Sequence, residues 1–163
     1  MESLINKKNA SAAEQRKYIA FKLGDELYAV NVMNAQEVMG MIPIGHVPDT
    51  QPYMKGVIDL RGTIVPIVDL RVKYGMEEKA YNDDTAIMIT EMHNELVGLV
   101  VDSVVDVLQL SIEDIQHTPH FTAKADRDSV EGIGKVNDEI IIVLEANRML
   151  SADEMKGLAQ ANI

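Results

Sequence analysis

The sequence contains no cysteine and no tryptophan, and it is short of basic residues. Without cysteine the chain can form no disulfide, no thiolate zinc site and no cysteine nucleophile, so a reducing, cytosolic compartment is expected. The 15 Lys and Arg residues are outnumbered by 26 Asp and Glu, which gives a net charge of −11. Because so acidic a chain repels phosphate backbones and anionic lipid surfaces, we expect no nucleic-acid partner and no direct insertion into a membrane.

Long hydrophobic runs are also missing. No apolar stretch approaches the roughly 20 residues that span a bilayer, and Met1 to Arg16 has no hydrophobic stretch of the signal-peptide type. We therefore expect a cytoplasmic protein. Hydrophobic residues still make up 47% of the chain, and 17 Val and 16 Ile stand against 12 Leu. Because β-branched side chains favour pleated, half-buried surfaces, this composition predicts a mainly β fold.

Alternating apolar residues predict four β-hairpins, at residues 18–32, 57–68, 86–101 and 130–144. A further strand is expected from Val104 to Leu110. Residues 1–16 have no sustained apolar period and are interpreted as a flexible N-terminal leader. Ser151 and Glu154 have the spacing of a capping box, which predicts that a C-terminal helix and tail occupy residues 151–163.

The segments between the hairpins are less regular. Asn34 to Met39 is long enough for only a short helix, and Met41 to Tyr53 is interpreted as an irregular connection because it holds three of the five prolines. Pro66 cannot donate to a sheet ladder, so its strand is expected at an edge or a bulge. A polar stretch from Met76 to Asp84 marks the junction between two halves, and His117 to Ser129 is expected to be a long polar loop.

The two halves of the chain resemble each other. Residues 56–69 align without gaps on residues 132–145, an offset of 76, and Glu26-Leu27 align on Glu95-Leu96, an offset of 69. Because closure removes the sheet edges that lone hairpins expose, we expect two small barrels. Subdomain 1 would cover about residues 17–80 and subdomain 2 about 81–146, with an exchange of strands between them left open.

No catalytic constellation is found. The four histidines form no metal-binding pair with a nearby carboxylate on a predicted helix, no serine lies in a G-x-S-x-G turn, and Gly132 to Lys135 lacks the other residues of a phosphate loop. We therefore expect no enzyme, no metal and no cofactor. Four of the ten methionines cluster around the irregular connection, where they either fill the core or form a partner site. They are Met33, Met39, Met41 and Met54.

From Gly56 to Arg71 the chain reads GVIDLRGTIVPIVDLR, and this segment resembles the CheW family of bacterial chemotaxis coupling proteins. Further matches are Gln36-Glu37, Tyr81-Asn82-Asp83, Val97 to Asp102 and Val105 to Leu108. Matches spread over four segments are far more specific than a single motif. The resemblance implies a CheW-like domain over residues 17–155, with two SH3-like five-stranded β-barrel subdomains, short helices and a C-terminal helix.

The resemblance also implies a function. CheW-like proteins bridge the cytoplasmic tips of chemoreceptors to the regulatory domain of the histidine kinase CheA. The chain is therefore expected to be a non-catalytic adaptor in chemotaxis signal transduction, recruited from the cytoplasm to membrane-associated receptor arrays. Receptor-binding positions of the family match here at Glu37, Gly56, Arg61, Thr85, Gly98 and Val107. No comparable signature marks the kinase-binding surface.

Among the matched positions, Arg61 is the strongest candidate for a direct contact, because its guanidinium offers five fixed donors at a hairpin tip. Gly56 and Gly98 are expected to act through the backbone, either at a bulge or where a partner approaches closely. Departures from the family pattern at Met39 and Asp59 bear on receptor selectivity.

Two alternatives to the adaptor are left open. One is a CheW-like module cut from a larger signalling protein. The length argues against it, because 163 residues leave no room for a catalytic or receiver domain. The other is a generic SH3-like peptide-binding module. Against it, five Tyr and two Phe are few for an aromatic-lined groove.

Overall fold

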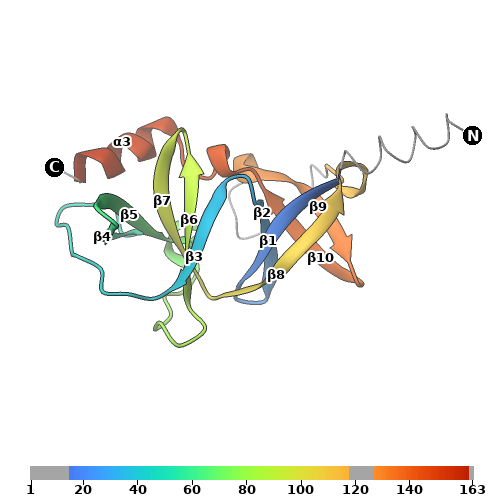
Figure 1. The fold of residues 1–163 in the computed structure, drawn as a ribbon, viewed down its shortest axis with the longest axis horizontal. Coiled ribbons are helices and arrows are strands. Elements are labelled where there is room, and N and C mark those ends of the chain that lie inside the picture. Colours follow the sequence, from blue (N-terminus) through green and yellow to red (C-terminus); the bar gives the residue numbers. More distant parts are fainter. Residues whose placement is uncertain (1–14, 118–126, 162–163) are drawn as a thin grey trace, which may run out of the picture.

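The computed structural model describes residues 15–117 and 127–161, which form two five-stranded β-sheets (Figure 1). Sheet A contains, in spatial order, β8 (Ser103–Ser111), β1 (Gln15–Leu23), β2 (Glu26–Asn31), β10 (Glu139–Leu144) and β9 (Val130–Val136). Sheet B contains β3 (Ala35–Gly40), β6 (Ala86–Met92), β7 (Glu95–Val101), β5 (Thr63–Asp69) and β4 (Met54–Leu60). The helices are α2 (Leu70–Lys73), η1 (Ile112–Asp114), η2 (Arg127–Ser129), η3 (Ala146–Arg148) and α3 (Ala152–Ala161). The mainly β prediction is confirmed.

All four predicted hairpins are present, as β1–β2, β4–β5, β6–β7 and β9–β10. Their turns use left-handed backbone: φ is +51° at Arg61, +49° at His93 and +64° at Asn94. Such turns match the right-handed twist of the strands that they join. Of the expected leader, residues 1–14 lie outside the described residues, whereas Gln15 and Arg16 belong to β1. Residues 118–126 of the expected polar loop also lie outside them.

The short helix predicted over residues 34–39 is wrong, because this segment lies in strand β3, which pairs with β6 along one edge of sheet B. Pairing with a distant strand overrides a local pattern that is too short to nucleate a helix. Pro66 is not in an edge strand either, since β5 lies between β4 and β7. The parallel ladder of β5 with β7 begins at Ile67, and a bulge in β4 lies between the Met54–Val68 and Gly56–Ile67 pairs, one pair away from Pro66.

Each sheet combines strands from both halves of the chain. The hairpin β1–β2 joins β8, β9 and β10, and the hairpin β6–β7 joins β3, β4 and β5. The joins are two parallel ladders, β2 with β10 and β5 with β7, and two antiparallel ladders, β1 with β8 and β3 with β6. The two sheets therefore do not coincide with residues 17–80 and 81–146, because each half gives two strands to one sheet and three to the other.

The internal repeat extends to the pairing register. In sheet B, Ile67 pairs with Gly98, and in sheet A, Val143 pairs with Ala29. These pairs are related by the same offsets, 76 between Ile67 and Val143 and 69 between Ala29 and Gly98. The two sheets are thus two copies of one strand arrangement, with their hairpins exchanged.

The structure corrects the expectation of closed barrels, because neither sheet closes on itself within the described residues. In the described part of the chain, no ladder joins the two edge strands of either sheet, and each pair of edges meets only at one isolated bridge. Gly45 bridges Val57 in sheet B, and Gln116 bridges Ile133 in sheet A. The backbone before each bridge cannot extend the ladder, because Pro43 lacks a donor and residues 112–114 form the helical turn η1.

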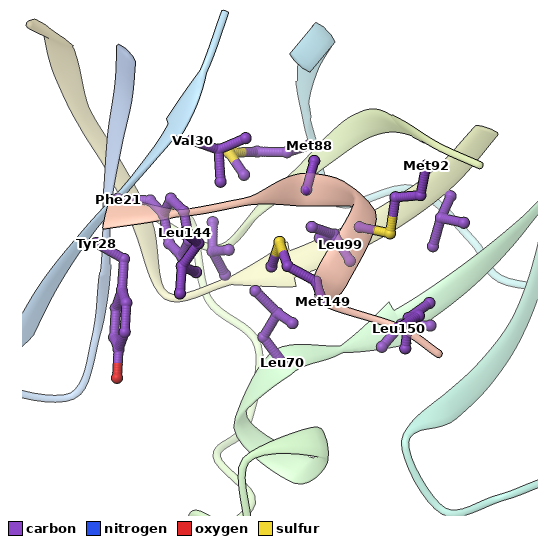
Figure 2. Packing of buried hydrophobic residues seen from close by; sticks show 14 of the residues in the cluster. Phe21, Tyr28, Val30, Leu70, Met88, Met92, Leu99, Leu144, Met149 and Leu150 are labelled. Atoms are coloured by element: carbon purple, nitrogen blue, oxygen red, sulfur yellow. The ribbon is translucent and has the colours of Figure 1, made fainter. Parts of the chain in front are cut away.

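Buried side chains form three clusters. One fills the inside of sheet A and includes Tyr18 and Ile141, and one fills the inside of sheet B and includes Val65 and Ile87. The largest lies between the sheets (Figure 2). In Figure 2 it is represented by Phe21, Tyr28, Val30, Leu70, Met88, Met92, Leu99, Leu144, Met149 and Leu150. Burial of this shared cluster holds the two sheets together.

The predicted capping box is confirmed at the start of α3. The backbone N–H of Ser151 donates to Glu154 Oε1 at 2.9 Å, and the N–H of Glu154 donates to Ser151 Oγ at 3.1 Å. Glu154 also pairs with Lys73 at 3.1 Å, and Met155 and Leu158 are buried. These contacts fix α3 against the β4–β5 side of sheet B (Figure 1).

Candidate functional site

The structure brings Glu37 and Arg61 into contact. Glu37 lies on edge strand β3, and Arg61 lies in the β4–β5 turn at the other edge of sheet B. Arg61 Nη2 is 3.2 Å from Glu37 Oε1, and Nη1 donates to Oε2 at 3.4 Å. The Arg61 side chain is 72% exposed and that of Glu37 33%, so the pair offers most of its donors to an approaching partner.

The turn that carries Arg61 is fixed by its neighbours. Asp59 Oδ1 accepts a hydrogen bond from the backbone N–H of Gly62 at 2.7 Å, and the left-handed backbone of Arg61 continues into Gly62 at φ +90°. On the facing strand, Gln36 Nε2 donates to Glu91 Oε2 at 2.7 Å. The side chains of both edges are therefore oriented before any partner binds.

A depression of about 240 Å³ lies beside the ion pair. It is lined by Gln36, Glu37, Leu60, Arg61, Thr63, Ile89 and Leu96. Three of these residues are aliphatic and four are polar or charged, a combination that suits an apolar side chain flanked by a polar group. A larger hollow of about 780 Å³ lies between residues 47–54 and α3, and none of the six family-matched positions lines it.

Gly56 and Gly98 are buried backbone positions. Gly56 has φ +142°, and a Cβ there would lie 2.0 Å from the carbonyl oxygen of Gly45, at the bridge that joins the edges of sheet B. A Cβ on Gly98 would lie 2.5 Å from Ile67 Cδ1 inside that sheet. Both glycines permit the close packing that places the Arg61 turn beside β3.

Thr85 is also buried, with 7% of its surface exposed. Its Oγ1 accepts a hydrogen bond from the N–H of Asn82 at 2.9 Å, and its own N–H donates to Asn82 Oδ1 at 3.2 Å. The neighbouring Tyr81 donates its hydroxyl proton to Asp69 at 2.9 Å, and burial together with this bond raises the pKa of Tyr81. Thr85 thus shapes the loop that leads into β6.

Val107 is separated from these positions. It lies on β8, an edge strand of sheet A, and is 53% exposed. The structure therefore gathers five of the six family-matched positions on sheet B or the loop that enters it, and places the sixth on the other sheet.

The three aliphatic residues of the depression, like Thr63, were not singled out by the sequence analysis. Leu60, Ile89 and Leu96 belong to three different strands, and nothing in their local patterns distinguishes them from core residues. The methionine cluster divides: Met54 is buried, Met39 and Met41 pack against the core of sheet B, and Met33 is 83% exposed. Core packing therefore explains three of these four methionines.

The seam between the sheets contains a charged pair. Arg71 donates through Nε and Nη2 to the two oxygens of Asp102, each at 2.7 Å, and the N–H of Gly24 donates to the same carboxylate at 2.7 Å. Burial opposes ionisation of Asp102, but the hydrogen bonds from Arg71 and Gly24 outweigh it and hold the pKa of Asp102 below its usual value. This pair ties α2, after sheet B, to the β1–β2 turn of sheet A.

Two other classes of site were sought within residues 15–117 and 127–161. No three His, Asp or Glu side chains gather there as metal ligands. No helix in these ranges combines the length and the apolar composition needed to cross a bilayer.

Comparison with known proteins identifies the family. Residues 17–154 match the family model of the CheW-like domain. The chain is 34% identical over 140 residues to chemotaxis protein CheW of Klebsiella aerogenes, covering 86% of this chain and 84% of the relative. It is 30% identical to CheW of Helicobacter pylori over 152 residues, covering 93% and 92%.

A solved structure gives the same answer. The crystal structure of the scaffolding protein TtCheW from Thermoanaerobacter tengcongensis superposes with a TM-score of 0.79 at 31% identity, covering 85% of this chain and 94% of that one. The family model and the solved structure each match most of this sequence, and the chain belongs to the CheW-like domain family.

Proposed function

We propose that this chain is a non-catalytic adaptor of bacterial chemotaxis, which couples chemoreceptors to the regulatory domain of the histidine kinase CheA. The observation that carries the proposal is the family match over residues 17–154, together with relatives named for chemotaxis and a scaffolding protein of the same fold. An adaptor acts by raising the effective concentration of one partner beside the other. Recruitment to receptor arrays at the membrane is part of this proposed role and is argued from the role alone.

The receptor site of this proposal is the depression beside Glu37 and Arg61. A helical partner segment would present carbonyl oxygens at its C-terminal end, which an exposed guanidinium can bind. The aliphatic side chains of Leu60, Ile89 and Leu96 would contact an apolar side chain of the same helix. Gly56, Thr85 and Gly98 support this site through the backbone and the β6 loop, while Val107 lies apart from it.

The receptor site is tested by Arg61→Glu. We expect this change to weaken binding of a receptor cytoplasmic fragment by at least about tenfold, since it places two carboxylates side by side at the rim. Because Arg61 is exposed, the free energy of unfolding should change by no more than about 0.5 kcal/mol. The matched control is Arg148→Glu, an exposed arginine paired with Glu145 at 3.8 Å outside the depression. Unchanged receptor binding by Arg61→Glu would leave Arg61 as a turn residue only.

The adaptor role is tested by kinase activity. Autophosphorylation of the kinase in receptor-containing membranes should respond to receptor ligand only when the chain is added, and the purified chain alone should turn over no phosphodonor. Loss of ligand response in the absence of the chain, with recovery on its addition, distinguishes an adaptor from a generic peptide-binding module. A folded chain that forms no complex with either protein would overturn the proposal.

A further inference from the structure

The hollow of about 780 Å³ between residues 47–54 and α3 has no part in the proposed receptor site. Ligand pockets in proteins span about 300–1,000 Å³, so this hollow has room for several side chains of a partner segment. Two of its lining side chains, Met54 and Leu158, also belong to the core cluster between the sheets. The other apolar or aromatic residues that line it are Val47, Pro48 and Tyr53. The hollow can therefore take up aliphatic side chains.

The polar side chains of the hollow include three carboxylates, and none of the described residues that line it is Lys, Arg or His. Asp49 and Asp153 are exposed, and neither forms an ion pair with any residue that the structure describes. Glu154 differs from them, because it already pairs with Lys73 at 3.1 Å. The loop wall and the helix wall of the hollow thus each present a carboxylate that lacks a cation, which favours a partner with positive charges.

Lys73 shows how a cation is held at this end of the molecule. Its ammonium lies 3.1 Å from Glu154 and 5.6 Å from the centre of the Tyr53 ring, and Glu154 and Tyr53 both line the hollow. An ammonium group is stabilised by a carboxylate and by the face of an aromatic ring. A further ammonium that enters the hollow meets the same two kinds of group.

The chain contains a segment that matches this surface, at its N-terminus and outside the described residues. Residues 3–8 read SLINKK, in which two aliphatic side chains are followed closely by two lysines. The aliphatic residues are Leu4 and Ile5, and the lysines are Lys7 and Lys8. Charge is also unevenly divided, because residues 1–22 hold five Lys and Arg against two Glu, whereas the rest of the chain holds ten against 24 Asp and Glu. The basic N-terminal segment is therefore attracted to acidic surfaces of the same protein.

The place where this segment leaves the described chain decides which copy it meets. The segment continues into strand β1 at Gln15, in sheet A, whereas the hollow lies beside α3 at the sheet B end of the molecule (Figure 1). To enter its own hollow, the segment has to be stretched along the molecule, which costs backbone entropy. The hollow of a second copy is reached without stretching the segment.

We propose that the hollow beside α3 docks residues 3–8 of a second copy of this chain. The aliphatic pair of the segment contacts the apolar walls, and its two lysines lie against Asp49 and Asp153. Because each copy carries the segment on one sheet and the hollow beside the other, the contact is heterologous and the copies associate head to tail. The inference goes beyond the proposed function and requires neither a receptor nor a kinase.

Self-association of the full chain tests the inference. In sedimentation velocity at low salt, the mass of the wild-type chain should rise with concentration and fall when salt is added. The double variant Lys7→Glu, Lys8→Glu leaves the hollow unchanged, and it should raise the concentration at half association by at least about tenfold. Asp153→Lys should have an effect of the same size. Combining the three substitutions should restore association to within about threefold of wild type, because the charges of the contact are exchanged.

The matched control is Glu95→Lys, which reverses an exposed carboxylate outside the hollow and should change association by less than about twofold. Circular dichroism checks that each variant is folded. A second measurement locates the contact. A synthetic peptide of residues 1–14 is added to the isotope-labelled full chain, at a concentration where the chain is monomeric, and the amide resonances of residues 47–54 and of α3 should shift.

Three results would overturn the inference. The first is a wild-type chain that stays monomeric at every concentration, since a peptide that then shifted the resonances of residues 47–54 would place the segment in its own hollow. The second is self-association that either Lys7→Glu, Lys8→Glu or Asp153→Lys leaves unchanged. The third is a peptide that shifts resonances only on other surfaces. None of these results bears on the proposed function, which is tested separately by receptor binding and kinase activity.

Discussion

At the scale of single residues, the Arg71–Asp102 pair is a charged contact at the seam between the sheets. Both side chains are mostly buried, at 15% and 16% exposure, and the carboxylate accepts three hydrogen bonds. A buried pair of this kind contributes little compared with an apolar pair, but removing one partner leaves the other charge unsatisfied. Its role is therefore to fix the relative position of the sheets.

Asp102→Ala is expected to lower the free energy of unfolding by about 2–4 kcal/mol, because Arg71 and the N–H of Gly24 both lose their acceptor. Urea unfolding at neutral pH measures the change. The control is Glu145→Ala, which removes an exposed ion pair with Arg148 and should cost no more than about 0.5 kcal/mol. Equal effects of the two substitutions would contradict a structural role for Asp102.

The same carboxylate predicts a dependence of stability on pH. Because the folded-state pKa of Asp102 is held below the unfolded value of about 4, its contribution is present above that pH and is lost as the pH falls toward the folded-state pKa. The difference in unfolding free energy between wild type and Asp102→Asn should therefore shrink between pH 6 and pH 3, values chosen about the unfolded pKa. A difference in unfolding free energy that does not vary over this range would contradict a lowered pKa of Asp102 in the folded protein.

Residue-scale prediction from the sequence has a clear limit here. Arg61 was singled out by its place at a hairpin tip and by the family resemblance, and the same resemblance matched Glu37. Their contact was not predicted, because Glu37 lies 24 residues away on another strand. Only the curling of sheet B brings its two edge strands together, and no local pattern encodes that. The buried state of Thr85 was equally hidden, since a threonine before a strand is typical of exposed turns as well.

At the scale of the elements, glycine at two equivalent positions allows the sheet edges to meet. A Cβ on Gly56 would lie 2.0 Å from Gly45 O, and a Cβ on Gly132 would lie 2.8 Å from Gln116 O. Gly132 is Gly56 plus the offset of 76, so both sheets use the same device. The edges of each sheet can approach because neither Gly56 nor Gly132 carries a side chain.

Gly56→Ala should cost at least about 2 kcal/mol of unfolding free energy, since the backbone is left-handed and the carbonyl of Gly45 cannot move without breaking the bridge. Denaturant midpoints measure it. Gly40→Ala on β3, where a Cβ would have no neighbour within 4 Å, is the control and should be neutral or slightly stabilising. Reduced receptor binding by Gly56→Ala at full stability would instead indicate a direct contact.

Hairpins and caps were predictable because their signals are local. Alternation located the four hairpins, and the Ser151–Glu154 spacing located α3. The strand β3 was missed because its apolar residues Ala35, Val38 and Met39 follow the i, i+3, i+4 spacing of a helix and do not alternate. Its conformation comes from pairing with β6, which lies some fifty residues further along the chain.

At the scale of the whole molecule, the cluster between the sheets makes them one cooperative unit. Leu99 of sheet B and Val30 of sheet A both lie in it and are fully buried. The repeat was inferred from the sequence and the two five-stranded units from the family resemblance, whereas the exchange of strands was left open. Equal hairpins fit either arrangement, and only the ladders between strands of different halves decide between them.

Leu99→Ala is therefore expected to destabilise both sheets together, by about 2–5 kcal/mol. Amide hydrogen exchange should show equal losses of protection free energy in β6, in sheet B, and in β1, in sheet A. Val65→Ala, inside sheet B, offers a comparison of the same kind. Loss of protection confined to β6 after Leu99→Ala would mean that the sheets unfold independently.

The parallel ladder between β2 and β10 also has a consequence for biosynthesis. Residues 26–31 are synthesised more than a hundred residues before their partner strand β10, which ends at Leu144. Sheet A cannot be completed until β10 has been translated, whereas a hairpin forms within microseconds. The nascent β1–β2 segment thus waits with its apolar face uncovered, and a chaperone has its longest opportunity to act on this hairpin.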